Sequence, residues 1–412
     1  MANKYAREYN SGSKEVAFLD TGKCRSYEEE IEDMINKAVA EFPVFEEASW
    51  FLELARRRLL DFTSGRKKVF VVGNSLPDEI FWMFGITPVR LMGGSRILTG
   101  ISDSDLPRDA DPVTRAVYGF LSQIDGNPLT VVPLVNDSSR KIAYLLKRKG
   151  KDVYTVSVPP MKNVGALAEW SRQMELLAEK LSVYTRRSYS KRRLQKAGKE
   201  VADAKRQLQI FELLAGKRQQ NLSGIFRIFV PFCYLLADDY REWTRQMLAV
   251  NRRLAKMKED ADTSIRKVLL FGSPVYFPNY KVPFLLKEAG LSFGGNFIVS
   301  DVIKTYDGTG GFEEMCRRSF VNDGSSSYVK NDTLFLKISQ YLKQYPVDGA
   351  VCHVLKGQIE FDFEMERFER LFAKYDVPVI RMETDYSNQD VEQLRLRVEA
   401  FAEMLKQRKS GK

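Results

Sequence analysis

The sequence of 412 residues is poor in the side chains that most often carry metal or redox chemistry. It has a single histidine and four cysteines, and no two of the cysteines form a CxxC pair. Zinc and iron–sulfur sites need several imidazoles or thiolates that converge on the metal, so the cysteine spacing alone predicts no such site. We expect Cys24, Cys233, Cys316 and Cys352 to be reduced thiols. A cluster built from these four cysteines stays open as an alternative, although their spacing does not support it.

Other common signatures are also missing. No run approaches the roughly 18 consecutive apolar residues of a membrane span. Residues 1–15 lack the apolar core of a secretory signal, so we expect a cytoplasmic protein without a membrane segment. The sequence has neither the glycine-rich phosphate loop of nucleotide-hydrolysing enzymes nor the GxGxxG dinucleotide pattern in its strand-to-helix turns. It also has no zinc-finger, RNP or helix-turn-helix pattern, so we do not expect nucleic-acid binding.

The bulk composition is that of a folded protein with more than one domain. Hydrophobic residues make up 44% and aromatic residues 12%, which argues against disorder. The net charge of +10 comes partly from basic clusters at residues 56–58, 66–68 and 186–193. Such clusters attract polyanions, including the phosphates of coenzyme A, although a solvated helix face is the more common explanation.

Strand-like and helix-like segments alternate in two parts of the sequence. Short apolar runs predict strands at residues 69–72, 129–134, 153–156, 268–271, 296–300, 350–354 and 377–382. Between the two parts, residues 165–216 and 239–259 carry apolar residues at helical spacing. Strands that alternate with helices predict parallel sheets. We therefore predict an α/β fold of two Rossmann-like parallel-sheet domains with an N-terminal helical segment and a central helical region.

The predicted boundaries follow from these patterns. The N-terminal helical segment covers residues 1–65, the first α/β domain 66–160, the helical region 161–265 and the second α/β domain 266–412. Within the first segment, Ser26 is a plausible N-cap, and a second helix is expected at 46–60. The polar segment 311–332 is rich in turn residues and is a candidate mobile loop.

Several stretches carry a likeness to a known family. The HVLK run at residues 353–356, the RMETDYS run at 381–387 and the QLRLRVEAF segment at 393–401 closely resemble the 2-hydroxyacyl-CoA dehydratase and benzoyl-CoA reductase family, and the D-component type in particular. Weaker likeness follows in the family's order at residues 73–91, 105–121, 133–146 and 268–290.

The resemblance also shows what this chain has lost. In that family, three cysteines hold a 4Fe-4S cluster, and this chain has Asp111, Asn136 and Gln358 at those positions. Oxygen and amide groups are poor ligands for an iron–sulfur cluster, which selects soft thiolates. We therefore predict no cofactor on this chain and expect a 4Fe-4S cluster on a homologous, cysteine-containing partner subunit. Whether a different metal binds at these positions is left open.

The predicted site lies where ligands usually bind in parallel α/β sheets, at the carboxyl ends of the strands. The three substituted positions follow such ends, so we expect them to line a polar pocket. Ser75 follows the first strand in a turn that could offer backbone N–H groups to a ligand, although the favoured explanation is that Ser75 and Ser273 are N-caps, which need no ligand. Glu383 is a further pocket candidate, with a structural contact or a partner contact as the alternative.

His353, the single histidine, is the candidate acid–base residue. The favoured alternative is a hydrogen-bonded structural histidine at a strand end, because no carboxylate or nucleophile is adjacent in sequence.

Two functions fit this reading. By resemblance, the chain is one subunit of an acyl-CoA dehydratase or reductase complex, in which an ATP-dependent activator ATPase supplies an electron. It would then shape the acyl-CoA pocket while the partner subunit carries the cluster. The alternative is a non-catalytic structural or regulatory paralogue that binds partner proteins or acyl-CoA without turnover. The identity of the acyl-CoA, the choice between dehydration and ring reduction, and the oligomeric state are left open.

Overall fold

Two four-stranded parallel sheets form the frame of the computed structural model, which describes residues 24–43, 45–60, 68–260, 265–294, 306–323 and 327–410. The first sheet has the order β2-β1-β3-β4 and contains β1 (Lys68–Val72), β2 (Thr87–Leu91), β3 (Thr130–Leu134) and β4 (Val153–Ser157). The second has the order β6-β5-β7-β8 and contains β5 (Arg266–Gly272), β6 (Leu291–Gly294), β7 (Gly349–Leu355) and β8 (Val379–Thr384). The repeated parallel order confirms the prediction of two Rossmann-like sheets.

Burial on both faces explains why most strands could be recognised as apolar runs. All seven residues of β7 are buried, and the central residues of β1 and β5 are buried too. Parallel sheets covered by helices on both faces favour such continuous apolar strands. Strands β2 and β6 were not predicted, and the strand predicted at 296–300 lies outside the described residues.

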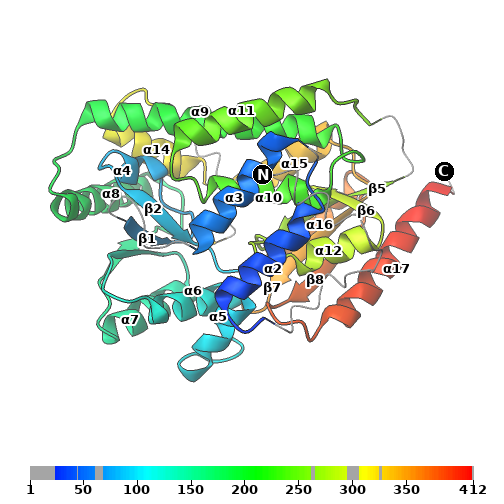
Figure 1. Cartoon of the computed structure of the whole chain (residues 1–412), viewed down its shortest axis with the longest axis horizontal. Helices are drawn as coiled ribbons and strands as arrows, with labels where there is room; N and C mark the ends of the chain where they lie inside the picture. Colours follow the sequence, from blue (N-terminus) through cyan, green and yellow to red (C-terminus); the bar gives the residue numbers. More distant parts are fainter. Residues whose placement is uncertain are drawn as a thin grey trace.

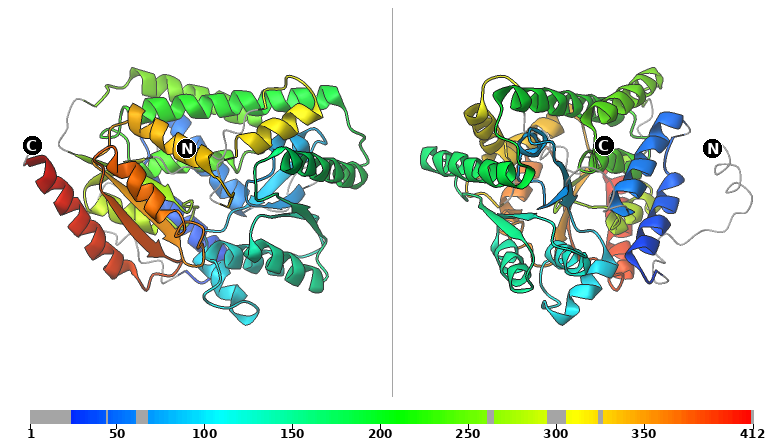
Figure 2. Two further views of the ribbon diagram at one scale, coloured as in Figure 1. Left: turned by 180° about the vertical axis from the view of Figure 1, so that it is seen from behind. Right: turned by 60° about the vertical axis from the view of Figure 1, so that its left-hand side comes forward.

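Long helices cover both sheets. Helices α9 (Lys191–Gly216) and α11 (Tyr240–Lys256) run side by side along the top of the molecule, spanning the space above the two sheets (Figures 1 and 2). The predicted central helical region also contains α8 (Val164–Thr185) and α10 (Gly224–Tyr234). Every residue of α10 is buried. A helix that is apolar on all sides shows no amphipathic pattern, and α10 was therefore not predicted.

The N-terminal helices α2 (Tyr27–Val39) and α3 (Glu46–Leu60) match their predicted positions. Ser26 caps α2, because its Oγ accepts a hydrogen bond from the Glu29 amide at 3.2 Å. Both helices share one hydrophobic core with α9, α10, α11 and the second sheet. They are thus packed onto the second α/β unit and the central helices.

The remaining helices connect the strands or follow the last one. They are α4 (Asp78–Trp82), α5 (Arg96–Ile101), α6 (Pro112–Gln123), α7 (Asp137–Arg148), α12 (Lys281–Glu288), α14 (Phe312–Val321), α15 (Asp332–Gln344), α16 (Met365–Ala373) and α17 (Val391–Ser410). No helix in the described ranges is both long enough and apolar enough to cross a bilayer.

Helix α14 corrects the prediction of a mobile loop at 311–332. Met315, Cys316 and Phe320 on its inner face are buried in the core of the first sheet. The Phe320 ring stacks on Trp170 of α8, with ring centroids 6.1 Å apart, and Ser319 accepts a hydrogen bond from the Trp170 indole at 3.2 Å. The acidic and basic residues of its outer face give this segment a polar composition that hides the apolar face.

Candidate functional site

A cavity of about 190 Å³ lies between the two sheets, where the carboxyl ends of their central strands meet. The loops after β1, β3, β5 and β7 all contribute to its lining. In both sheets the strand order reverses next to these strands, which is where parallel α/β folds bind ligands. The cavity is far larger than the roughly 10–15 Å³ that one water needs.

Four of the predicted pocket residues lie together in this cavity. Ser75 follows β1, Asp111 precedes α6, Asn136 follows β3, and Gln358 follows β7. The first three belong to the first α/β unit and the fourth belongs to the second. That these residues bind a substrate stays a prediction.

Asp111 joins the two units. Its Oδ2 caps α6 by accepting hydrogen bonds from the Thr114 amide at 2.9 Å and the Thr114 hydroxyl at 2.7 Å. Its Oδ1 accepts a hydrogen bond from Gln358 Nε2 at 2.9 Å. Gly357, with φ +82°, turns the chain toward Asp111, and a Cβ on Gly357 would lie 3.1 Å from the Asp111 amide nitrogen. The loop after β7 therefore fits closely against the N-terminus of α6.

Gln358 has one amide atom bonded and one unpaired. Nε2 donates to Asp111, while the buried Oε1 has no hydrogen-bond partner within the described residues. A buried acceptor without a partner costs about 1–3 kcal/mol, so a donor that reaches Oε1 would stabilise this arrangement.

Asn136 closes the N-terminus of α7. Its Oδ1 accepts a hydrogen bond from the Ser139 amide at 2.9 Å, and the Asn136 amide donates to Ser139 Oγ at 3.1 Å. This reciprocal pair is a capping box. It satisfies the amides of Asn136 and Ser139 without a ligand.

The donor set of the cavity does not fit an iron–sulfur cluster. No cysteine lines the cavity among the described residues. Cys352 points from β7 into an aromatic core and does not line the cavity, and burial raises the pKa of its thiol to about 12. Burial likewise raises the pKa of Cys316 to about 12 and that of Cys233 well above its usual value. The described part of the chain also contains no group of three histidine, cysteine or carboxylate side chains that could hold a metal ion.

His353 lies outside the cavity lining. It is buried on β7, and its Nδ1 donates a hydrogen bond to the Ser273 carbonyl at 2.7 Å. Burial lowers the pKa of His353 to about 4, so the ring is neutral near pH 7. This geometry matches the structural alternative for His353.

The two serine turns are not N-caps. Ser273 Oγ accepts a hydrogen bond from the Leu355 amide at 2.9 Å, which ties the end of β5 to β7, and the next helix begins only at Lys281. Helix α4 begins at Asp78 after Pro77 and has no side-chain cap, so Ser75 does not close it. Ser75 remains as a cavity-lining residue.

Arg90 holds the turn that carries Ser75. From the neighbouring strand β2, its guanidinium donates to the Gly73 carbonyl at 2.9 Å, the Leu76 carbonyl at 2.9 Å and the Asp78 carboxylate. Asp78 also accepts a hydrogen bond from Tyr234 at 3.0 Å. Arg90 was not identified from the sequence, because an arginine inside a strand gives no sign of burial.

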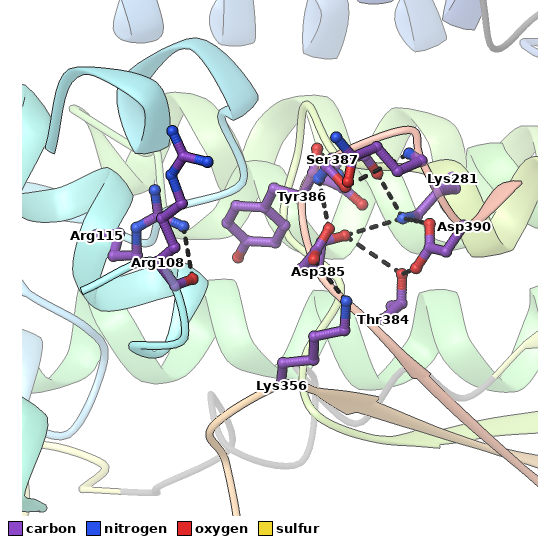
Figure 3. Close-up of polar contacts among 11 residues, drawn as sticks. Arg108, Arg115, Lys281, Lys356, Thr384, Asp385, Tyr386, Ser387 and Asp390 are labelled. Carbon is purple, nitrogen blue, oxygen red and sulfur yellow. Dashed lines mark hydrogen bonds and ion pairs between the residues drawn. The ribbon is translucent and has the colours of Figure 1, made fainter. Parts of the chain in front are cut away.

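A second polar network fixes the loop after β8 (Figure 3). The buried Lys281 ammonium donates to the carbonyls of Asp385 at 3.0 Å and Ser387 at 2.7 Å and pairs with Asp390. Burial lowers the pKa of Lys281. Burial opposes ionisation of Asp385 too, but hydrogen bonds from Lys356 and Ser387 prevail and lower its pKa to about 2.

Glu383 does not lie in the cavity. It is exposed on β8 and forms an ion pair with Arg381 at 3.0 Å. Successive strand residues point to opposite faces, so the side chain of Glu383 leaves the sheet opposite the buried Thr384.

Two acidic cavity residues were not identified from the sequence. Glu360 follows Gln358 in the loop after β7, and Asp323 follows α14. Burial raises the pKa of Glu360, and the charges of Asp111 and Asp362 raise it further. Only the closeness of Glu360 to Gln358 in the sequence could have indicated its place.

Two comparisons show which known proteins this chain is similar to. The sequence model described as 2-hydroxyglutaryl-CoA dehydratase, D-component, matches residues 74–405 of this chain. A relative from Escherichia coli (strain K12), "Putative dehydratase subunit YjiM", is 26% identical over 343 residues, which cover 80% of this chain and 89% of the relative. Both descriptions are of one component of a larger enzyme.

Proposed function

Because the chain belongs to the 2-hydroxyglutaryl-CoA dehydratase D-component family, we propose that it is the subunit that shapes the acyl-CoA pocket while a homologous cysteine-containing subunit holds the 4Fe-4S cluster. In this proposal, an ATP-dependent activator ATPase is the further partner. The chain is thus a dehydratase-type subunit, and the pocket and its partners are the proposed part.

The Asp111–Gln358 hydrogen bond carries the proposal. It joins two of the three substituted positions at 2.9 Å, across the boundary between the two α/β units. A side-chain pair that bonds directly holds the loops together without a metal ion. The space between the sheets therefore remains as a largely apolar cavity with a few polar groups, which suits an organic ligand.

The surroundings of the cavity also suit a thioester of coenzyme A. The cavity has room for an acyl group, and its neutral polar groups at Ser75, Asn136 and Gln358 can orient a carbonyl or hydroxyl group. The exposed cations Arg108 and Lys356 lie on the two loops that meet at Asp111, in reach of solvent. We propose that they attract the phosphates of coenzyme A outside the cavity.

Iron content and activity test the proposal together. We expect no stoichiometric iron on the purified chain and a cluster on the complex with a cysteine-containing homologue. We also expect dehydratase activity from that complex after treatment with the activator and ATP. A cluster on the isolated chain would refute the division of roles.

A matched pair of variants links the activity to the cavity. Gln358→Leu removes the hydrogen bond to Asp111 and the unpaired acceptor Oε1 at similar volume, and we expect it to lower the activity of the complex without changing its iron content. Glu366→Gln on the exposed face of α16 is the control, since this residue is remote from the cavity lining. Full complex formation with no activity under any condition would instead favour the non-catalytic paralogue.

A further inference from the structure

The charged side chains among the described lining residues of the cavity are all acidic. Asp111, Asp323 and Glu360 line it, and the described lining residues include no lysine, arginine or histidine. Lys162 lies behind Asp323, where it contacts the backbone carbonyls of Val321 and Asp323. Arg90 also lies behind the lining and is neutralised by Asp78. An anion in the cavity would therefore meet carboxylates without a cation that lines the same space.

The two helix N-termini at the cavity are partly occupied by their own caps. Asp111 caps α6 and brings a negative charge of its own, while Asn136 and Ser139 form the capping box of α7. An N-terminus attracts anions through free N–H groups and its partial positive charge. Here side chains already accept from the amides of Val113 and Thr114 in α6 and of Ser139 in α7.

Glu360 also lies among negative charges. Burial is the main cause that raises the pKa of its carboxyl group, and the charges of the Asp111 and Asp362 carboxylates raise it further. A cation near this part of the cavity would act in the opposite direction. The local potential is therefore negative.

A second observation indicates which ligand group fits. Gln358 Oε1 is a buried acceptor without a partner, and Gln358 lines the cavity. It would gain from an O–H or N–H donor, and a carboxylate offers none. An uncharged acyl chain with a hydroxyl group matches both the potential and this acceptor.

We propose that the cavity accepts an uncharged hydroxyacyl chain and rejects an acyl chain that ends in a carboxylate. This inference rests on the proposed acyl-CoA function and names its substrate class. It separates this chain from the dicarboxylic substrate in the description of its family. Glu360 is the specificity-determining residue, because no ion pair from a described residue compensates its charge.

Binding of two matched thioesters tests the inference. Calorimetry with the full chain, and with its complex with the cysteine-containing subunit, would compare 2-hydroxypentanoyl-CoA with 2-hydroxyglutaryl-CoA. The two differ only in the distal group, so coenzyme A contributes equally to both. We expect the dicarboxylic thioester to bind at least about ten-fold more weakly, as a like charge a few ångströms away predicts.

Variants of Glu360 then test whether this residue causes the difference in binding between the two thioesters. Glu360→Gln should reduce the difference in affinity between the two thioesters several-fold, and Glu360→Lys should make the dicarboxylic thioester the tighter ligand. Glu366→Gln, which removes an exposed charge on α16, should leave the difference unchanged. Thermal unfolding of each variant checks that the fold is kept.

Each outcome decides the matter. Equal binding of both thioesters would overturn the substrate class and leave the acyl-CoA pocket standing. Discrimination that persists in Glu360→Gln and Glu360→Lys would overturn the role of Glu360. Binding of neither thioester to the chain or to the complex would overturn the proposed function and the inference together.

Discussion

The contact between Asp111 and Gln358 predicts a measurable coupling between the two α/β units. Asp111→Ala removes the cap of α6, which costs about 1 kcal/mol. It also leaves the buried Gln358 Nε2 without its acceptor, at about 1–3 kcal/mol. We therefore expect Asp111→Ala to lower the free energy of unfolding by roughly 2–4 kcal/mol.

A double-mutant cycle with Gln358→Ala isolates the pair. A hydrogen bond to a charged group contributes about 1.5–3 kcal/mol, so the two substitutions should be non-additive by about this amount. Urea unfolding followed by tryptophan fluorescence would measure each corner of the cycle. The variant Asp111→Asn is the control for the cap, because asparagine caps helices as well as aspartate does.

A coupling energy within about 0.5 kcal/mol of zero would refute the reasoning, since independent sites add within that limit. It would mean that the two loops do not meet in solution as described. The proposal that a side-chain pair holds the former cluster position would then fail as well.

Three further predictions address other parts of the site. Arg90→Met should lower the free energy of unfolding by about 3–5 kcal/mol, because Asp78 is left buried without its cation. The double variant Arg90→Met/Asp78→Asn should recover part of this loss in the same denaturant titration. The pKa of His353 is lowered by burial to about 4, so its contribution to stability is present above pH 6.5 and is lost as the pH falls toward 4. The wild type should therefore lose about 3 kcal/mol more than His353→Asn between pH 7 and pH 4, and equal losses would contradict the burial of His353. Among the four thiols, only that of Cys24 should react with a thiol reagent in the folded protein, and rapid labelling of Cys352 would contradict its place in the aromatic core.

The sequence revealed those elements whose residues carry a local pattern. Strands β1, β3, β5 and β7 are apolar runs of β-branched and aromatic residues, and their positions were predicted within a few residues. Strand β2 was missed because it contains Pro88 and Arg90. Only the tertiary structure shows that Arg90 is buried, since its charge is compensated by Asp78 from the preceding helix, α4. Strand β6 was missed because four residues are too few to show an alternation.

The site could be predicted in part for a topological reason. Loops after neighbouring parallel strands meet at the same edge of a sheet, so Ser75 and Asn136 could be expected together. The direct bond between Asp111 and Gln358 depends on how the two sheets face each other, and no pattern within either segment encodes that distance. The same applies to Glu360, whose importance comes from the absence of a cation among the described residues that line the cavity.

The substitutions at the three former cysteine positions act as a set. Asp111 and Asn136 now close the helices that follow them, and Gln358 binds Asp111 across the two units. Restoring a single cysteine would therefore remove a cap or the bridging bond without creating a site for iron, because a cluster needs several thiolates at once. Restoring all three would exchange two caps and one hydrogen bond for metal ligation. The caps and the bridging bond thus stabilise the cavity through side chains alone, and we expect its chemistry to depend on what the carboxylates and amides can bind.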